Sequence, residues 1–185
     1  MHPVVNIALR AARKAGDIIE RAVENLDQLE IESKSPSDFV TEIDKAAEQE
    51  ILYNLKKAYP DHAFQCEESG NSGASDAEYV WVIDPLDGTT NFVRGIPHYA
   101  VSIACLKNGR IEHAIVYDPI RREEFTASRG GGAQLNGRRI RVRKTYEKHT
   151  ALFATGIPFG GRSEEEMDKY LKVMKSLALG SAGIR

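Results

Sequence analysis

Two Asn-Gly dipeptides between apolar segments constrain the fold of this 185-residue chain more than any other feature. Asn108-Gly109 joins Ala100–Lys107 to Ile111–Tyr117, and Asn136-Gly137 follows a further short apolar segment. Asn-Gly favours the two-residue hairpin turn because both of its residues accept positive φ angles. The middle of the chain therefore predicts an antiparallel meander of strands.

Apolar residues at helical spacing lie on both sides of this meander. Pro3–Leu26 carries an alanine-rich stripe, and a second helical segment runs over Thr41–Tyr59 until Pro60 ends it. Near the other end of the chain, Glu164–Leu179 predicts a third helix. Helices followed by a meander predict an α+β fold, with an N-terminal helix pair packed on a largely antiparallel sheet.

Other segments have weaker signals. Ala63–Cys66 and Tyr79–Ile83 are strand candidates, and the second of them is expected to stop at Asp84-Pro85. Glu32–Asp38 is a polar stretch in which Pro36 acts as a breaker, and Gly70–Asp76 is expected to be a loop.

The polar stretch Arg143–Thr150 is the best candidate for a domain boundary. We therefore predict one α+β domain over residues 1–145 and the start of a second α/β domain over residues 146–185. A unit of about 35 residues is too short to be stable alone. The second domain is therefore expected to be incomplete, and the chain to lack a C-terminal part.

Composition and charge exclude several classes of protein. The chain has 25 Lys and Arg against 27 Asp and Glu, so its net charge of −2 gives no global basic field for nucleic acid. The basic run Arg138–Lys144 is more typical of a solvated strand face. No apolar run approaches the ~18 residues that span a membrane, and no signal-peptide pattern is present. Cys66 and Cys105 are expected to be buried thiols. The default expectation is a cytoplasmic enzyme or binding protein.

The segment most suggestive of chemistry is Asp84-Pro85-Leu86-Asp87-Gly88-Thr89-Thr90-Asn91, which follows the apolar strand candidate Tyr79–Ile83. Two carboxylates at ~4 Å repel by roughly 1–4 kcal/mol, so one of them is protonated or a cation bridges them. Such oxygen ligands, with the Leu86 carbonyl as a further one, suit Mg²⁺, Mn²⁺ or Ca²⁺. Backbone N–H groups after Gly88 could hold an anion. The pattern suggests a phosphate site; two ordinary Asp-Pro and Asp-Gly turns are the alternative.

Glu67-Glu68 follows the strand candidate Ala63–Cys66. If this strand lies beside Tyr79–Ile83, one of the two acids meets Asp84 and the cluster holds three carboxylates. Three carboxylates around two Mg²⁺ ions leave the net positive charge that a phosphate dianion needs. A solvated turn is the alternative interpretation.

Asp44 lies at the start of the second predicted helix. It either complements the helix N-terminus, which contributes about 0.3–1 kcal/mol, or accepts a proton from Thr89 and so orients an attacking water. The sequence leaves both interpretations open.

Together these segments resemble the inositol monophosphatase family, and most closely a bacterial branch of it. The resemblance runs from near Met1 to Arg185, and its most specific parts are Ser37–Asp44, Glu67–Gly70 and Asp84–Asn91. It implies a layered αβαβα sugar-phosphatase fold and Mg²⁺-dependent hydrolysis of a small phosphorylated polyol, with inositol-1-phosphate as the first candidate. It also implies two or three Mg²⁺ ions per site, sensitivity to lithium and a homodimer.

The resemblance assigns a role to each motif residue. The family's metal ligands correspond to Glu67, Asp84, the carbonyl of Leu86, and Asp87. Its substrate contacts correspond to Leu86, Asp87, Gly88 and Thr89. Its catalytic residues correspond to Asp44, Thr89 and Glu67, where Asp44 and Thr89 position the water.

The family's later Trp-Asp motif, which completes a metal site, is absent from this sequence. The chain alone is therefore expected to be weakly active or inactive. Phosphatases of bisphosphorylated nucleotides or of fructose 1,6-bisphosphate are the nearest enzyme alternatives. A different class is a regulatory binding protein, because members of this bacterial branch are associated with transcription antitermination and its accessory factors.

Overall fold

The computed structural model describes residues 2–23, 31–35, 38–142, 147–157 and 163–185. It divides the chain into two compact units, residues 1–141 and residues 142–185. The first unit holds a helix pair and an eight-stranded sheet, and the second holds one long helix with two short strands. The predicted α+β class with a largely antiparallel sheet is confirmed.

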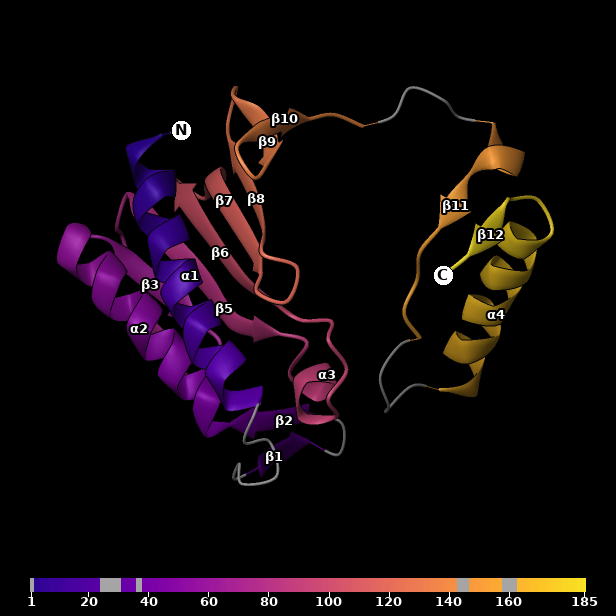
Figure 1. Cartoon of the computed structure of the whole chain (residues 1–185), viewed down its shortest axis with the longest axis horizontal. Helices are drawn as coiled ribbons and strands as arrows, with labels where there is room; N and C mark the ends of the chain where they lie inside the picture. Colours follow the sequence, from indigo (N-terminus) through magenta and orange to yellow (C-terminus); the bar gives the residue numbers. More distant parts are fainter. Residues whose placement is uncertain (1, 24–30, 36–37, 143–146, 158–162) are drawn as a thin grey trace. The chain divides into compact units, whose positions relative to one another are not determined.

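Helices α1 (Pro3–Val23) and α2 (Glu42–Ala58) pack against each other along one face of the sheet (Figure 1). The alanines of α1 are fully buried, because small side chains let this helix approach its neighbours closely. At Gly16, a Cβ atom would lie 2.5 Å from the Tyr117 ring, so glycine makes room for that ring. Both helices begin and end close to the predicted residues.

The sheet has the strand order β10-β9-β8-β7-β6-β5-β3-β4, and only the β3–β5 pair is parallel. Its strands are β3 (Ala63–Cys66), β4 (Gly70–Ser72), β5 (Tyr79–Asp87), β6 (Ala100–Lys107), β7 (Arg110–Asp118), β8 (Glu123–Ser128), β9 (Gly132–Leu135) and β10 (Arg138–Ile140). Asn108 and Gly109 both have positive φ, as do Asn136 and Gly137, so both predicted hairpins are confirmed.

Buried apolar side chains from the central strands meet the helices. Trp81 and Ile83 from β5, Ile103 from β6 and Ile115 from β7 are each at most 2% exposed. Together with the apolar stripe of α1 they form the core cluster. The end of β5 packs into this core and is held rigidly by it.

The structure has strand residues at three places where none were predicted. Gly70–Ser72 adds an edge strand to the predicted loop, and β5 continues beyond Ile83 to Asp87. The polar stretch near Pro36 contributes to a two-stranded antiparallel sheet, β1 (Ile31–Ser35) with β2 (Asp38–Thr41). Pairing with neighbouring strands provides these backbones with hydrogen-bond partners, a tertiary effect that local sequence does not reveal.

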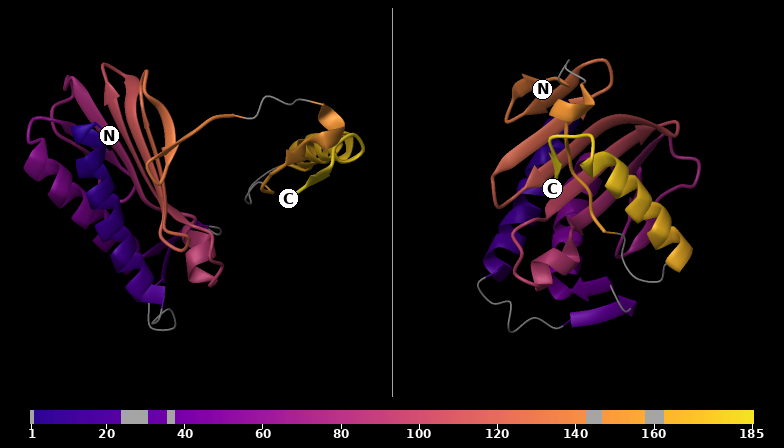
Figure 2. Two further views of the ribbon diagram at one scale, coloured as in Figure 1. Left: turned by 45° about the horizontal axis from the view of Figure 1, so that its top comes forward. Right: turned by 90° about the vertical axis from the view of Figure 1, so that its right-hand side faces the viewer.

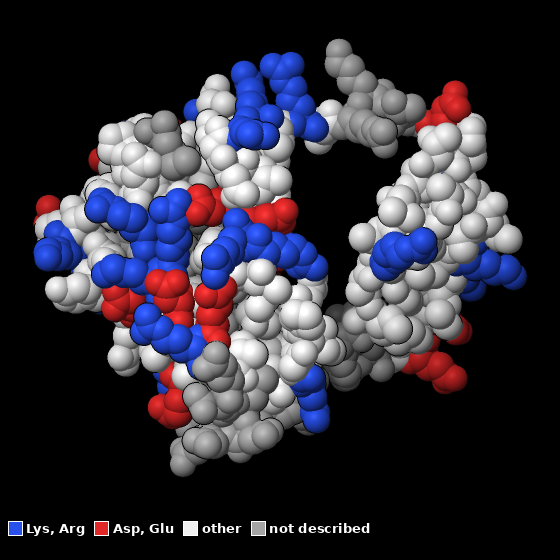
Figure 3. All heavy atoms as spheres, in the orientation of Figure 1, with Lys and Arg blue, Asp and Glu red and all other residues white. Residues whose placement is uncertain are grey.

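Two further predictions concern the exposed basic strand and the two cysteines. Figure 3 shows Lys and Arg side chains interleaved with Asp and Glu over the helices, where Lys14 pairs with Glu50 at 2.9 Å. All three residues of β10 are exposed, as expected for a solvated basic strand. Cys66 and Cys105 are buried free thiols.

The second unit contains α4 (Glu164–Ala178) and the parallel strands β11 (Leu152–Phe153) and β12 (Gly183–Ile184), and Figure 2 shows it from two further sides. A capping box starts α4: the Ser163 hydroxyl accepts from the Glu166 amide, and the Glu166 carboxylate accepts from the Ser163 amide. Among the described residues, none of the helices is long and apolar enough to cross a bilayer.

Candidate active site

The parallel pair β3–β5 brings two acidic segments together. The register ends at Cys66 opposite Ile83, and the Glu67 amide continues the ladder by donating to the Ile83 carbonyl at 3.2 Å. Parallel strands end at the same edge of a sheet, so the residues that follow, Glu67 and Asp84, become neighbours. The two carboxyl groups are close enough that Glu67 contributes to the raised pKa of Asp84. The condition set for these two strands, that they lie side by side, is met.

A β-bulge shapes the end of β5. Asp84 pairs with Ser102 and Asp87 pairs with Ala100, so β5 has one more residue than β6 between these pairs. Bulges accommodate proline in a strand and redirect side chains, and they are frequent beside active sites. Here Pro85 and Leu86 are both buried, which interrupts the alternation of the strand and leaves Asp87 exposed.

Leu86 contributes backbone atoms to the site rather than its side chain. The side chain is 1% exposed and belongs to the core. The Leu86 amide donates to Asp84 Oδ1 at 3.2 Å, and the Leu86 carbonyl accepts from the Thr89 hydroxyl at 2.9 Å. A carbonyl oxygen has two lone pairs, so this hydrogen bond leaves one of them for a further ligand.

Thr89 connects this turn to helix α2. Its Oγ1 lies 3.2 Å from Asp44 Oδ2 and is oriented to donate to it, so the predicted contact between these two residues is present. Thr89 is the first residue of the short helix α3 (Thr89–Val93), which the sequence analysis missed. Asp44 is 1% exposed and lies in the first turn of α2.

Gly88 makes the sharp turn between β5 and α3 possible. Its φ is +99°, and a Cβ atom there would lie 2.9 Å from the His98 carbonyl oxygen. Both the left-handed backbone and the close approach therefore require glycine.

We expect Gly88→Ala to destabilise the protein by roughly 1–3 kcal/mol, because left-handed strain and backbone overlap add together. Gly95→Ala is the matched control, since Gly95 has φ +69° with open space around it and should lose about 1–2 kcal/mol from strain alone. Urea unfolding of both variants measures the difference. Equal losses would show that the approach of His98 costs nothing.

Burial and like charges raise the pKa values of two carboxyl groups in this site. Burial raises the pKa of Asp44 to about 8, with the charges of Glu68 and Glu67 adding to the effect and the Thr89 hydrogen bond opposing it. Burial also raises the pKa of Asp84 to about 7, with Glu67 and then Asp87 adding to the effect. The site thus holds more negative charge than its surroundings balance, and a cation would be stabilised there.

The oxygen donors at the end of β5 fit a hard divalent cation. Glu67, Asp84 and the Leu86 carbonyl supply only oxygen atoms, which Mg²⁺ prefers over the nitrogen and sulfur ligands of zinc. Within the described segments, no three His, Cys, Asp or Glu side chains form a preassembled metal cage. Asp87 acts on Asp84 through its charge but stays exposed.

Glu48, an acid in α2 that is 2% exposed, is not among the residues predicted from the sequence. It follows Asp44 by four residues and therefore lies on the same face of the helix. The available signal was its position among the apolar residues Ala47, Ile51 and Leu55 of the buried stripe. A buried acid needs hydrogen-bond donors around it, but the sequence does not show which residues provide them.

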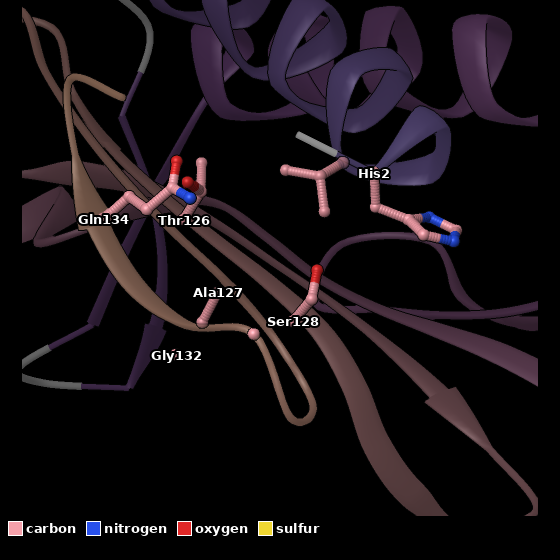
Figure 4. Close-up of a pocket in the computed structure, with 8 residues that line it drawn as sticks. His2, Thr126, Ala127, Ser128, Gly132 and Gln134 are labelled. Atoms are coloured by element: carbon pink, nitrogen blue, oxygen red, sulfur yellow. The ribbon is translucent and has the colours of Figure 1, made fainter. Parts of the chain in front are cut away.

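A cavity of about 230 Å³ lies elsewhere, between the start of α1 and the β8–β9 hairpin (Figure 4). His2, Thr126, Ser128 and Gln134 supply its polar groups. None of the acidic residues described above lines this cavity, so it is distinct from the candidate site.

The chain belongs to the inositol monophosphatase family, whose sequence profile matches residues 1–184. The Nus factor SuhB of Pseudomonas aeruginosa is 54% identical over 187 residues, covering all of this chain and 69% of that protein. The solved extragenic suppressor protein suhB of Bartonella henselae has a TM-score of 0.93 at 38% identity, over 100% of this chain and 70% of that one. The inositol monophosphatase of Anabaena has a TM-score of 0.79 at 33% identity, over 98% and 65%. The family resemblance is therefore confirmed.

Proposed function

We propose that this protein hydrolyses a phosphate monoester in a Mg²⁺-dependent reaction, with inositol-1-phosphate as the first candidate substrate. The observation that carries this proposal is the meeting of the Glu67–Asp84 carboxyl pair with the Asp44–Thr89 pair at one edge of the sheet. One pair is suited to bind cations, and the other is suited to hold a proton and orient a nucleophile. Membership of the inositol monophosphatase family supports this division of roles.

The proposed ligands of one Mg²⁺ are Glu67, Asp84 and the Leu86 carbonyl, and those of a second are Asp84 and Asp87. When bound, the ions would lower the pKa of water and stabilise charge on the phosphoryl oxygens. In the family these sites hold two or three Mg²⁺ ions. The raised pKa of Asp84, caused by burial and by the neighbouring charges of Glu67 and Asp87, supports this assignment, because a cation would relieve the same repulsion.

The residues of the chain itself position the reactants. Thr89 Oγ1 can donate a hydrogen bond to Asp44, which leaves the lone pairs of the threonine oxygen to accept from the attacking water. The Leu86 carbonyl, 2.9 Å from Thr89 Oγ1, is a second possible acceptor for the same hydrogen and keeps the hydroxyl beside the bulge. We assign the phosphate contacts to Gly88 and Thr89, at the turn that leads from β5 into α3.

Phosphate release from inositol-1-phosphate tests this function. The assay compares Mg²⁺ with EDTA in the 185-residue chain and in a chimera that continues Arg185 with the remaining part of the Pseudomonas relative. Fructose 1,6-bisphosphate and an adenosine 3′,5′-bisphosphate serve as competing substrates. Mg²⁺-dependent release, highest for inositol-1-phosphate, supports the proposal. A chimera that folds, binds Mg²⁺ and hydrolyses none of the three would refute it.

A second candidate function is a transcription accessory role in the cytoplasm. The Pseudomonas relative is named a Nus factor, and this name is the observation that favours the role. Binding of the chain to purified transcription elongation complexes tests it, with the Asp84→Asn variant as comparison. Retained binding by that variant would separate the two functions onto different surfaces. The family also leads us to propose a homodimer and inhibition of the phosphatase by lithium.

A further inference from the structure

Glu48 is an acidic residue in the core of the first unit, near the proposed metal ligands. Its side chain is 2% exposed, and it lies one helical turn after Asp44 in α2. A buried carboxylate is costly unless hydrogen-bond donors surround it. Its partners therefore show what the fold uses it for.

Both carboxylate oxygens of Glu48 accept backbone amides from one turn. Oε2 accepts from the Glu68 amide at 2.8 Å, and Oε1 accepts from the Ser69 amide at 2.9 Å. These two residues directly follow Glu67 in the turn between β3 and β4. Hydrogen bonds from backbone amides to a carboxylate are among the stronger ones in proteins.

The turn is held on its other sides by the sheet. The Glu67 amide donates to the Ile83 carbonyl at 3.2 Å, and Cys66 pairs with Gly70 across the β3–β4 hairpin. The backbone of Glu67 is thus fixed before and after its Cα atom. Its exposed side chain is left to reach the carboxyl group of Asp84.

We propose that Glu48 is a positioning residue that holds the Glu67 turn in place and so sets the distance between Glu67 and Asp84. This inference rests on the proposed function, in which these two acids hold a metal ion. Helix α2 then contributes two residues to the site. Asp44 contacts Thr89, and Glu48 accepts hydrogen bonds from the turn that follows Glu67. Residues that orient metal ligands typically contribute 10- to 100-fold to metal affinity.

The chemistry of the carboxylate suggests the variant. Glu48→Gln keeps the shape of the side chain but replaces one acceptor oxygen with an NH₂ group, so one of the two amides loses its acceptor. Glu50→Gln is the matched control: it makes the same change in the same helix, where Glu50 accepts from Lys14 and Asn54 instead.

Two measurements on the 185-residue chain test the inference. Amide hydrogen exchange in EDTA reports the turn itself, and we expect exchange at Glu68 and Ser69 to become about tenfold faster in Glu48→Gln and to stay unchanged in Glu50→Gln. Calorimetric titration with Mn²⁺ alone reports the site, and we expect the Kd to rise about 10- to 100-fold in Glu48→Gln only. If Glu48→Gln does not fold, Glu48→Asp, which keeps both oxygens on a shorter side chain, is measured in the same way with a smaller change expected.

The outcomes separate the two hypotheses. If the unmodified chain does not bind Mn²⁺, the proposed metal centre fails, and with it the role of Glu48 at that centre. If the unmodified chain binds Mn²⁺ and the Glu48 variant binds it equally well, the positioning role fails while the proposed function stands. Unchanged exchange at both turn amides also overturns the positioning role.

Discussion

Asp84→Asn is expected to reduce Mg²⁺-dependent phosphate release by at least about 100-fold while leaving the fold intact. Asp84 belongs to both proposed metal sites, whereas its neighbour Glu67 belongs to one of them and cannot replace it. Asparagine has nearly the same shape but carries no charge, so it removes the ligand without opening a cavity. Phosphate release by the chimera at a series of Mg²⁺ concentrations measures the loss.

The same substitution is expected to lower activity without lowering stability. Because burial and the charges of Glu67 and Asp87 raise the pKa of Asp84 to about 7, its ionised form is disfavoured in the fold. Without a divalent cation, the asparagine variant should therefore be at least as stable as the unmodified protein at pH 8. Asp118→Asn, which removes only an ion pair with Arg121, serves as the control and should keep full activity. An Asp84→Asn variant with normal activity would remove Asp84 from the site.

The framework of the first unit was predictable because its signals are local. Each Asn-Gly turn requires two positive φ angles, which few other dipeptides adopt, and both hairpins formed as expected. The helix pair follows equally local rules, since α1 carries a continuous apolar stripe and α2 ends before Pro60. The parallel β3–β5 pair could be stated only as a condition, because strand order depends on long-range contacts.

The sequence is enough to select the acidic residues of the candidate site, but not to predict how they are arranged in space. Asp44, Glu67, Asp84 and Thr89 stand out because each is an acid or a hydroxyl residue after the end of a predicted strand or at the start of a predicted helix. The bulge at Pro85 depends on pairing with β6, so nothing local to this segment predicts that the strand extends to Asp87. Glu48 escaped notice because its partners are backbone amides, which have no side-chain signature.

Asp44→Asn is expected to remove much of the pH dependence of stability when no divalent cation is present. The pKa of Asp44 is about 8 in the fold against 3.8 ordinarily. A group whose pKa is raised on folding stabilises fully below its unfolded pKa, and this contribution is lost as the pH rises through the folded pKa. Between pH 4 and pH 8 the unmodified protein should therefore lose roughly 2–5 kcal/mol through this group, since one pKa unit corresponds to about 1.4 kcal/mol.

Urea unfolding in EDTA at several pH values between 5 and 8.5 measures this effect. The asparagine variant should overtake the unmodified protein as the pH rises, because it has no charge to bury. Glu50→Gln is the control of opposite sign: the bonds from Lys14 and Asn54 lower the pKa of Glu50, so its contribution is present at neutral pH and lost in acid. If Asp44→Asn and the unmodified protein keep a constant difference across this range, Asp44 is ionised in the fold without a cation. That result would contradict the raised pKa of Asp44, while an ionised Asp44 would still accept the hydrogen bond from Thr89.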